Sequence, residues 1–284
     1  MEIVSRVNDL KTLVRQAKQA GKSVGFVPTM GYLHEGHLTL MRQAKSENGI
    51  VVASIFVNPL QFGPSEDYAT YPRDFERDSK LASTAGVDIL FAPEVAQMYP
   101  RGVENMLTMV EVRRLSERLC GKARPGHFQG VATVVCKLFN LVEPDAAYFG
   151  QKDAQQVVVI KRMVEDLNMN LRIVAVPIVR ESDGLARSSR NVYLDAKERQ
   201  AALVLYESLM LAREKLTGGL RDAAQIIKLM NELINKQPLA KIDYISISDS
   251  ETLDELVVVD RPALIALAVR IGKTRLIDNV LWEG

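Results

Sequence analysis

The chain has 284 residues, of which 47% are hydrophobic, 25% are charged and 6% are aromatic. This composition is typical of a soluble globular protein and argues against a disordered or fibrous chain. Lysine and arginine number 36 against 35 acidic residues, so the chain has no overall attraction for nucleic acid. The length predicts one domain of usual size and a smaller second domain.

Neither a targeting segment nor a disulfide framework is predicted. Residues 1–23 are charged throughout and lack the apolar core and cleavage site of a secretion signal. No apolar stretch is long enough to cross a bilayer, so we expect a cytoplasmic protein with no membrane partner. Cys120 and Cys136 both fall in or near predicted helices, and we expect two reduced thiols.

Helices and strands alternate through the first part of the chain. Apolar periodicity and β-branched runs predict a helix at 10–20, a strand at 23–28, a helix at 36–46 and a strand at 50–57. The alternation continues with helices at 74–85, 130–141 and 155–167 and strands at 88–91, 146–149 and 171–176. Repeated alternation of this kind predicts an α/β fold with a parallel sheet covered on both faces.

The pattern changes after Asp183-Gly184. Two long helices at 196–216 and 223–235 precede strands at 242–248, 264–269 and 274–278. We therefore expect a first domain over residues 1–179 and a smaller α+β domain over residues 180–284.

Two of the three histidines, His34 and His37, stand at a predicted junction between strand and helix. Residues three apart share a helix face, so both imidazoles should point the same way. Free N–H groups at the start of a helix favour an anion, and Gly31 and Gly36 let a ligand approach the backbone closely. A lone histidine is more often structural, but this pair predicts a site for a nucleotide phosphate.

A zinc-protease motif and a P-loop are both excluded, because the spacing of their key residues is not found in this sequence. A zinc metalloprotease helix needs its histidines four apart, whereas His34 and His37 are three apart. Two segments end like a P-loop, but Gln16 and Leu267 stand where its first glycine belongs. No G-x-G-x-x-G motif follows a strand.

Further polar clusters stand where the predicted parallel strands end. They are residues 58–62, residues 149–153 with Gln155 and Gln156, and residues 187–191. Open α/β sheets bind ligands beyond the carboxyl ends of their strands. Each cluster alone is more often a turn or a helix cap, as Asp153 or Ser188-Ser189 could be. Residues 124–128, with Arg124 and His127, form another turn that is either part of the site or an ordinary loop.

Five segments together resemble one family, the pantothenate synthetases or pantoate–β-alanine ligases. The segments read PTMGYLHEGH at 28–37, IFVNPLQF at 55–62, RPGHF at 124–128, YFGQKD at 148–153 and SSRN at 188–191. The H-x-G-H motif alone is shared with nucleotidyltransferases and class I aminoacyl-tRNA synthetases. The N-P-x-Q and F-G-x-K-D motifs narrow the resemblance, which spans nearly the whole chain.

The resemblance implies a Rossmann-like N-terminal domain, a small C-terminal lid and a homodimer. It also implies a reaction of Mg²⁺-ATP in two steps. The carboxylate of pantoate attacks the α-phosphate to give pantoyl adenylate and pyrophosphate, and the amine of β-alanine then displaces AMP.

The resemblance also assigns roles to residues. His37 is the catalytic proton donor, assisted by His34 and Lys152, and the ligands of Mg²⁺ stay unassigned. Pantoate is bound by Gln61, Gln156 and Arg124, and β-alanine by Gln61. ATP is bound by Met30, Gly31, Tyr32, Leu33, His34, Glu35, Gly36, His37, Gly150, Gln151, Lys152, Asp153, Val179, Arg187, Ser188, Ser189 and Arg190. Arg187 departs from the family pattern, which has an apolar residue there, so this cation either tightens ATP binding or points to solvent.

Three other functions compete with this one. A nucleotidyltransferase that moves AMP or CMP onto a phosphate-bearing acceptor should have more cations than the neutral Gln61 and Gln156 provide. A tRNA synthetase needs a basic anticodon-binding region, which this neutral chain lacks. A nucleotide-sensing module would bind ATP and leave it unchanged.

Overall fold

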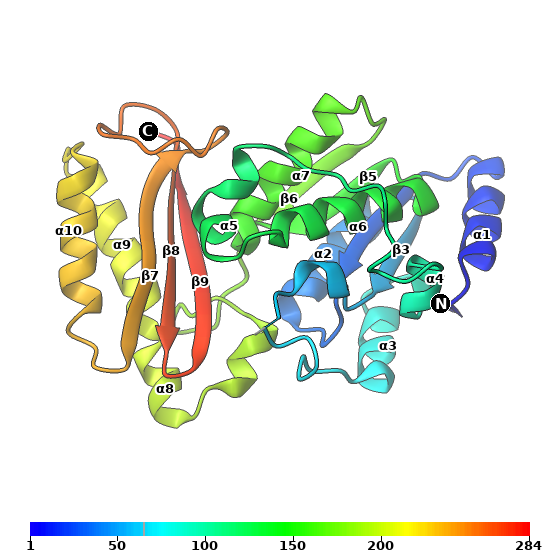
Figure 1. Cartoon of the computed structure of the whole chain (residues 1–284), viewed down its shortest axis with the longest axis horizontal. Coiled ribbons are helices and arrows are strands. Elements are labelled where there is room, and N and C mark those ends of the chain that lie inside the picture. The colour runs from blue at the N-terminus through cyan, green and yellow to red at the C-terminus, as the bar shows by residue number, and fades with distance from the viewer. Residues whose placement is uncertain (65) are drawn as a thin grey trace.

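The structure is a computed structural model that describes residues 1–64 and 66–284. Figure 1 shows two β-sheets, each packed against helices. The first is a six-stranded parallel sheet in the order β1-β4-β3-β2-β5-β6, and the second is a three-stranded antiparallel sheet in the order β7-β8-β9. The predicted α/β class with a smaller α+β part is confirmed.

The parallel sheet is formed by the first part of the chain. Its strands are β1 (Glu2–Val4), β2 (Val24–Thr29), β3 (Ile50–Ile55), β4 (Ile89–Phe91), β5 (Ala146–Gly150) and β6 (Arg172–Val176). Its helices are α1 (Val7–Gln19), α2 (Glu35–Glu47), α3 (Phe75–Thr84), α4 (Val95–Met98), α5 (Leu119–Ala123), α6 (His127–Val142) and α7 (Ala154–Asp166). Short 3₁₀ helices lie at η1 (Pro59–Gln61), η2 (Leu115–Glu117) and η3 (Gln151–Asp153).

Both faces of the parallel sheet are buried. Phe26 and Val52 face a core shared with α1, α6 and α7, whereas the adjacent Val27 and Val51 face α2 and α3. Side chains alternate between the faces of a strand, so continuously apolar strands supply both cores. This explains why the β-branched runs predicted buried strands correctly.

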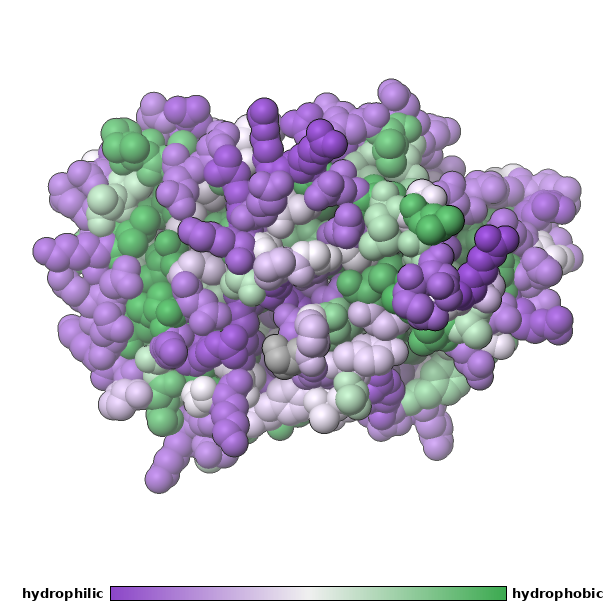
Figure 2. Space-filling view, viewed as in Figure 1, coloured by the Kyte–Doolittle hydropathy of each residue, from purple (hydrophilic) through white to green (hydrophobic). Residues whose placement is uncertain are grey.

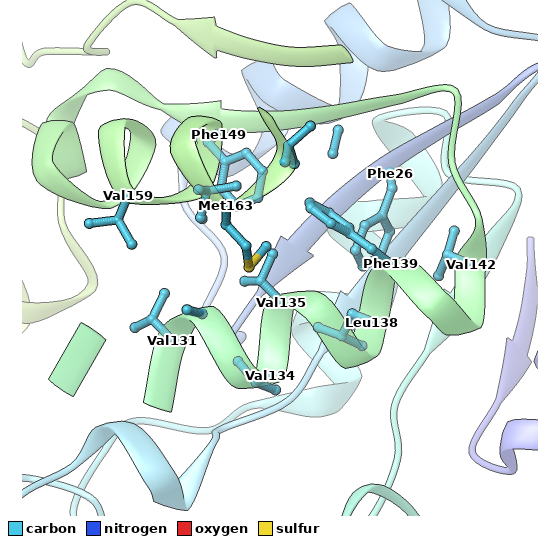
Figure 3. Close-up of a cluster of buried hydrophobic side chains, with 14 of the residues drawn as sticks. Phe26, Val131, Val134, Val135, Leu138, Phe139, Val142, Phe149, Val159 and Met163 are labelled. Carbon is cyan, nitrogen blue, oxygen red and sulfur yellow. The ribbon is translucent and has the colours of Figure 1, made fainter. Parts of the chain in front are cut away.

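An aromatic cluster joins the sheet to α6 and α7. In Figure 3 the ring of Phe139 on α6 lies beside the ring of Phe26 on the sheet. The ring of Phe139 meets Phe26 edge to face at 6.3 Å and Phe149 at 6.4 Å between centroids. Each buried phenylalanine contributes about 1.5–3 kcal/mol and each aromatic pair about 0.5–1.5 kcal/mol more. The cluster therefore fixes the sheet edge from which the polar segments project.

The C-terminal part has its own core. The antiparallel strands β7 (Ala240–Asp249), β8 (Ala263–Ile271) and β9 (Thr274–Trp282) pack against α9 (Leu203–Thr217) and α10 (Ala223–Ile234). The shorter α8 (Ala196–Ala201) and η4 (Ser189–Tyr193) precede them. None of the helices in the described ranges has the length and apolar character that a bilayer crossing requires.

Several predicted boundaries were wrong. The helix predicted at 196–216 is two helices, separated at Ala202. There the carbonyl of Ala202 accepts a hydrogen bond from the N–H of Leu205, three residues later, at 3.2 Å. The strand predicted at 50–57 ends at Ile55. The helix predicted at 130–141 begins at His127, because Gly126 takes a left-handed conformation with φ of 81° at its N-cap. β1, α4, α5 and the 3₁₀ helices are too short to show a period, and no prediction included them.

Candidate functional site

Two adjoining cavities lie beyond the carboxyl ends of the parallel strands. An inner cavity of about 200 Å³ is lined by Met30, His34, His37, Gln61, Gln156 and Arg187, among others. An intersheet cavity of about 870 Å³ lies between the two sheets, with Arg124 and Gln156 on one side and Tyr244 and Arg275 on the other. Lys152, Asp153, Ser188 and Arg190 line both cavities. Figure 2 shows a mostly hydrophilic face with scattered apolar patches.

His34 and His37 form a reciprocal cap at the start of α2. The Nδ1 atom of His34 accepts a hydrogen bond from the N–H of Gly36 at 3.1 Å, and the N–H of His34 donates to Nδ1 of His37 at 3.3 Å. The two rings lie 4.0 Å apart between centroids. Because each Nδ1 accepts, each ring must carry its proton on Nε2.

Both histidines are neutral near pH 7. Burial lowers the pKa of His37 to about 4, with the charge of Lys152 as a second cause. Burial and the neighbouring His37 lower the pKa of His34 to about 2. The predicted anion-binding groups are therefore neutral Nε2–H donors, and the N–H of Gly36 is already used by the cap.

Acid should destabilise the folded protein through its buried histidines. An unfolded chain has histidine pKa values near 6.5, so between pH 6.5 and 4 the unfolded state binds more protons than the folded state. Each of these two histidines stabilises the folded state fully above about pH 6.5. Below that pH, the free energy of unfolding should fall by roughly 1 kcal/mol per pH unit for each histidine. Urea denaturation across this range measures the slope, and the double variant His34→Gln, His37→Gln should have a shallower one. An unchanged slope in the double variant would assign the acid sensitivity to other groups.

A buried carboxylate holds the loop before α2. Asp78, 1% exposed, accepts from the N–H of Tyr32 at 2.6 Å and from the N–H of Leu33 at 2.7 Å. Tyr32 has a φ of 47°, which is unusual for a residue other than glycine. Arg77 donates to the carbonyl of Leu33 at 2.8 Å and lies over the ring of Tyr32. These contacts fix the strained turn that precedes the two histidines.

The segment after β3 is organised around Asn58, which is 1% exposed. Its Nδ2 donates to Oε1 of Gln61 and to the carbonyl of Gly130, both at 3.2 Å. Its Oδ1 accepts from the hydroxyl of Tyr99 at 2.6 Å and from the N–H of Leu60 at 3.3 Å. With Oε1 held, Gln61 presents its Nε2 to the inner cavity, 3.0 Å from the sulfur of Met30.

Arg124 and Arg190 are each paired with a carboxylate of the same loop. Arg124 contacts Glu66 through Nε at 2.5 Å and Nη2 at 2.6 Å. Arg190 contacts Asp67 through Nε at 3.1 Å and Nη2 at 3.0 Å. Two-pronged contacts of this kind fix the orientation of a guanidinium, so both arginines lie at the cavity walls in defined positions.

His127 closes the wall next to Arg124. Its Nδ1 lies 2.7 Å from the carbonyl oxygen of Gln61, and Nη1 of Arg124 lies 3.0 Å from its Nε2. Burial and the Arg124 charge lower the pKa of His127 to about 4. The turn at residues 124–128 therefore packs against the Gln61 backbone and is part of the site.

Lys152 stands where the two cavities meet. It lies on η3, between β5 and α7, with its side chain 20% exposed and its Nζ 3.9 Å from the Asp153 carboxylate. Asp153 occupies the N-cap position of α7 but makes no capping hydrogen bond, so its side chain stays available to the cavities. Ser188, by contrast, does cap η4 by accepting from the N–H of Arg190.

The predicted ATP residues are only partly brought together. In the described structure, the predicted residues that line neither cavity are Gly31, Tyr32, Leu33, Glu35 and Gln151. Leu33 is buried in the core beside α2, and Glu35 pairs with Arg42. The inner cavity collects the rest, Met30, His34, Gly36, His37, Gly150, Lys152, Asp153, Val179, Arg187, Ser188, Ser189 and Arg190.

Arg187 lines the inner cavity rather than extending to solvent. Its backbone N–H donates to the carbonyl of Val179 at 3.0 Å. Its Nε is buried and has no hydrogen-bond partner among residues 1–64 and 66–284. A buried donor without a partner costs free energy, so this guanidinium is available to an anion in the cavity.

Metal binding by protein groups alone is not built into the described residues, which contain no group of three or more His, Cys, Asp or Glu side chains able to hold an ion. Asp153 lines both cavities, and no arginine is paired with it in the part of the chain that the structure describes. A single available carboxylate suits an ion such as Mg²⁺, most of whose ligands are phosphate oxygens and water molecules.

Asp78, Asn58 and Tyr99 support the site but could not be identified as important to it from the sequence. Asp78 falls in a predicted helix, where an acidic residue is ordinarily a solvent-facing one. The position of Asp78 on the buried face of that helix, where a carboxylate is unusual, is the signal that could have identified it. Asn58 belongs to a predicted polar cluster, but nothing local shows that it orients Gln61.

Comparisons with known proteins agree over the whole chain. The family model described as pantoate-beta-alanine ligase matches residues 2–281. The pantothenate synthetase of Heliobacterium modesticaldum is 58% identical over 283 residues, and that of Caldicellulosiruptor bescii is 56% identical over 284 residues, each match covering 100% of both chains.

Solved structures agree as well. Pantothenate synthetase from Thermus thermophilus superposes with a TM-score of 0.93 at 50% identity over 99% of both chains. Pantoate-beta-alanine ligase from Francisella tularensis, complexed with beta-gamma ATP and beta-alanine, gives 0.81 at 37% identity over 99% of this chain and 97% of that one. The chain therefore belongs to the pantoate–β-alanine ligase family of enzymes.

Proposed function

We propose that the chain uses ATP to condense pantoate with β-alanine through a pantoyl adenylate, releasing AMP and pyrophosphate. The observation that carries this proposal is the inner cavity, where neutral imidazole donors, Lys152 and two glutamines face one another. The Francisella tularensis relative in complex with beta-gamma ATP and beta-alanine supports the choice of substrates.

In the first step a carboxylate oxygen of pantoate forms a bond to the α-phosphorus of ATP. The bond from that phosphorus to the bridging oxygen of the β-phosphate breaks, and pyrophosphate leaves with the electron pair. Negative charge grows on the phosphate oxygens and on the leaving group, so preplaced donors lower the barrier. We assign this task to the Nε2–H groups of His34 and His37 and to the ammonium of Lys152.

In this scheme His37 acts as a hydrogen-bond donor. Its pKa of about 4 leaves the ring neutral at pH 7, and a neutral Nε2–H stabilises charge without giving up its proton. This refines the role of proton donor that the family resemblance implies.

In the second step the amine of β-alanine attacks the acyl carbon of the adenylate. The new amide bond forms, AMP leaves with the electrons of the acyl–oxygen bond, and the amine loses a proton. We propose that Gln61 and Gln156 bind the hydroxyl and carboxyl groups of pantoate, and that Gln61 also lies near β-alanine. Arg124, held in place by Glu66, would also bind pantoate.

The nucleotide would occupy the remainder of the inner cavity. We propose that its base and ribose contact Val179, and that Arg187, Ser188, Ser189 and Arg190 contact the phosphates. The segment from Met30 to His37 would contribute the side chains of Met30, His34 and His37, together with Gly36, which lines the same cavity.

Mg²⁺ fits this arrangement as an ion carried by the triphosphate. When bound it would neutralise phosphate charge, and Asp153 is the carboxylate that would hold it, directly or through water. Lys152 and Arg190 would orient the phosphates on either side.

We further propose two domains, residues 1–179 and 180–284, with the second acting as a lid over the intersheet cavity. An acyl adenylate is hydrolysed readily, so a cover that excludes water would protect it. The homodimer and the cytoplasmic location stay predictions.

The test is ATP–pyrophosphate exchange measured with a panel of small carboxylic acids. We expect exchange that depends on pantoate and proceeds without β-alanine, because adenylation is a separate first step. Exchange that requires the amine would contradict the two-step scheme. Transfer of AMP or CMP to a phosphate-bearing acceptor would favour a nucleotidyltransferase, and binding of ATP without turnover a sensing module.

Replacing Gln61 or Gln156 with alanine should impair the use of pantoate far more than the binding of ATP. A buried site that hydrogen-bonds its substrate leaves groups unpaired when one partner is removed, at about 1–3 kcal/mol for each group. We expect KM for pantoate to rise about 10-fold or more, with the affinity for ATP little changed. Gln19→Ala, on the exposed end of α1, is the matched control. Equal losses for both substrates would make the two glutamines structural.

A further inference from the structure

A side chain of the C-terminal sheet reaches the turn that carries Lys152. Asn279 lies on β9 and is 2% exposed. Its side-chain amide points toward η3, the 3₁₀ helix that follows β5 of the parallel sheet. Its Nδ2 donates to the carbonyl of Gln151 at 3.0 Å and to the carbonyl of Lys152 at 2.9 Å. Both bonds join residues more than a hundred positions apart in the sequence.

The chemistry of the amide fixes its orientation. A primary amide nitrogen carries two hydrogens, one for each of the two carbonyl oxygens. The reverse orientation would place the amide oxygen against those two carbonyl oxygens, with no donor between them. The side chain of Gln151 adds a long contact, 3.5 Å from its Nε2 to Oδ1 of Asn279. Asn279 therefore holds the two peptide groups on either side of Lys152.

Asn279 is itself held by a buried ion pair. Arg180 contacts the two oxygens of Asp278 at 2.6 and 2.9 Å and donates to the carbonyl of Asn279 at 3.3 Å. Asp278 also accepts from the N–H of Asn279 at 2.7 Å, and Arg180 lies 4.6 Å from the ring centroid of Tyr206. Because Asp278 is 3% exposed, the amide of Asn279 has a rigid support.

We infer that Asn279 is a positioning residue for Lys152 and makes adenylation depend on the seating of the C-terminal sheet. Lys152 projects into both cavities from a single 3₁₀ turn, and a displacement of about 1 Å at a catalytic group can cost about 10²-fold in rate. The inference rests on the proposed function, because it takes Lys152 as the cation that acts on the phosphates.

The test is a double-mutant cycle between positions 279 and 152. Asn279→Ala should lower the rate of pantoate-dependent ATP–pyrophosphate exchange about 10- to 10²-fold in the parent. In the Lys152→Ala background the same substitution should change the rate by less than about 3-fold, because the group that it positions is gone. Equal losses in both backgrounds would overturn the inference and make Asn279 a general structural residue.

Two further variants guard against a folding artefact. Asn279→Asp keeps the shape of the side chain but offers no donor, so it should lose exchange as Asn279→Ala does. Asn231→Ala removes a comparable bond to a backbone carbonyl on α10, far from the cavities, and should leave exchange at the parent rate. Parent-like exchange in Asn279→Asp, or loss of the native circular dichroism spectrum in both position-279 variants, would also overturn the inference.

A binding measurement separates this inference from the proposed function. The same cycle is run on the Kd of a non-hydrolysable ATP analogue by calorimetry. If the parent binds the analogue but shows no exchange, the proposed function fails, while coupling between positions 279 and 152 in Kd still supports the positioning role. Exchange in the parent with no coupling in either measurement leaves the function standing and rejects the role of Asn279.

Discussion

Replacing Lys152 with alanine should lower pantoate-dependent ATP–pyrophosphate exchange about 10³-fold, as expected when a preplaced cation on transferring phosphates is removed. Arg124 and Arg190 are already bound to Glu66 and Asp67, and both histidines are neutral near pH 7. In the proposed mechanism, much of the positive charge offered to the reacting phosphates therefore comes from Lys152 and Arg187. Initial rates of exchange at saturating ATP and pantoate measure the effect.

The matched control for Lys152 is Lys161→Ala, on the exposed side of α7, which should retain the parent rate. Lys152→Arg tests geometry, because a broad, planar guanidinium does not replace a compact ammonium. Aminolysis of preformed pantoyl adenylate should fall much less, because no pyrophosphate leaves in that step. Parent-like exchange in Lys152→Ala would remove Lys152 from the mechanism, and parent-like exchange in Lys152→Arg would mean that the charge matters and the shape of the cation does not.

Replacing His37 with alanine should lower adenylation about 10²–10³-fold, the loss usual for one preorganised donor. In the proposed mechanism the Nε2–H of His37 stabilises charge that develops on the phosphates, whereas aminolysis moves no charge onto pyrophosphate and should suffer less. Single-turnover kinetics of each half-reaction in variant and parent measure the difference. Equal losses in both half-reactions would contradict the assignment.

The capping role of His37 needs its own control. Alanine also removes the acceptor for the N–H of His34, at a cost of about 1 kcal/mol in stability. Asparagine at position 37 keeps an acceptor close to the place of Nδ1 but does not reach the place of Nε2. His37→Asn should therefore unfold near the parent midpoint and still lose adenylation. If His37→Asn has the parent rate of adenylation, the role of His37 is to cap the helix, and its Nε2–H donor is not needed.

Much of the fold could be predicted because its signals are local. The β-branched run that becomes β3 is continuous, and such runs are typical of strands buried on both faces. Because the carboxyl ends of parallel strands meet at one edge, the polar clusters at 58–62, 149–153 and 187–191 were expected to converge there, and residues of all three line the inner cavity.

The supports of the site could not be predicted because they connect distant segments. Asp78 binds the backbone of Leu33 across 45 positions, and Asn279 binds that of Lys152 across 127. Neither contact leaves a periodic pattern, and both residues read as ordinary polar positions in a helix or a strand. The tautomers of His34 and His37 likewise follow from the cap geometry, whereas the spacing of three predicted only that both rings point the same way.

The contact between Asn279 and the turn at Lys152 also bears on how the enzyme is made. At about 5–20 residues per second, a ribosome takes roughly 6 to 25 s to add the 127 residues that separate them. All six strands of the parallel sheet precede residue 177 in the chain, and domains generally fold as units from the N-terminus during synthesis, so this sheet can form during that interval. The nascent chain thus passes through a stage with a folded sheet and an unanchored Lys152. If Asn279 positions Lys152 as inferred, adenylation should begin only once β9 has joined the fold.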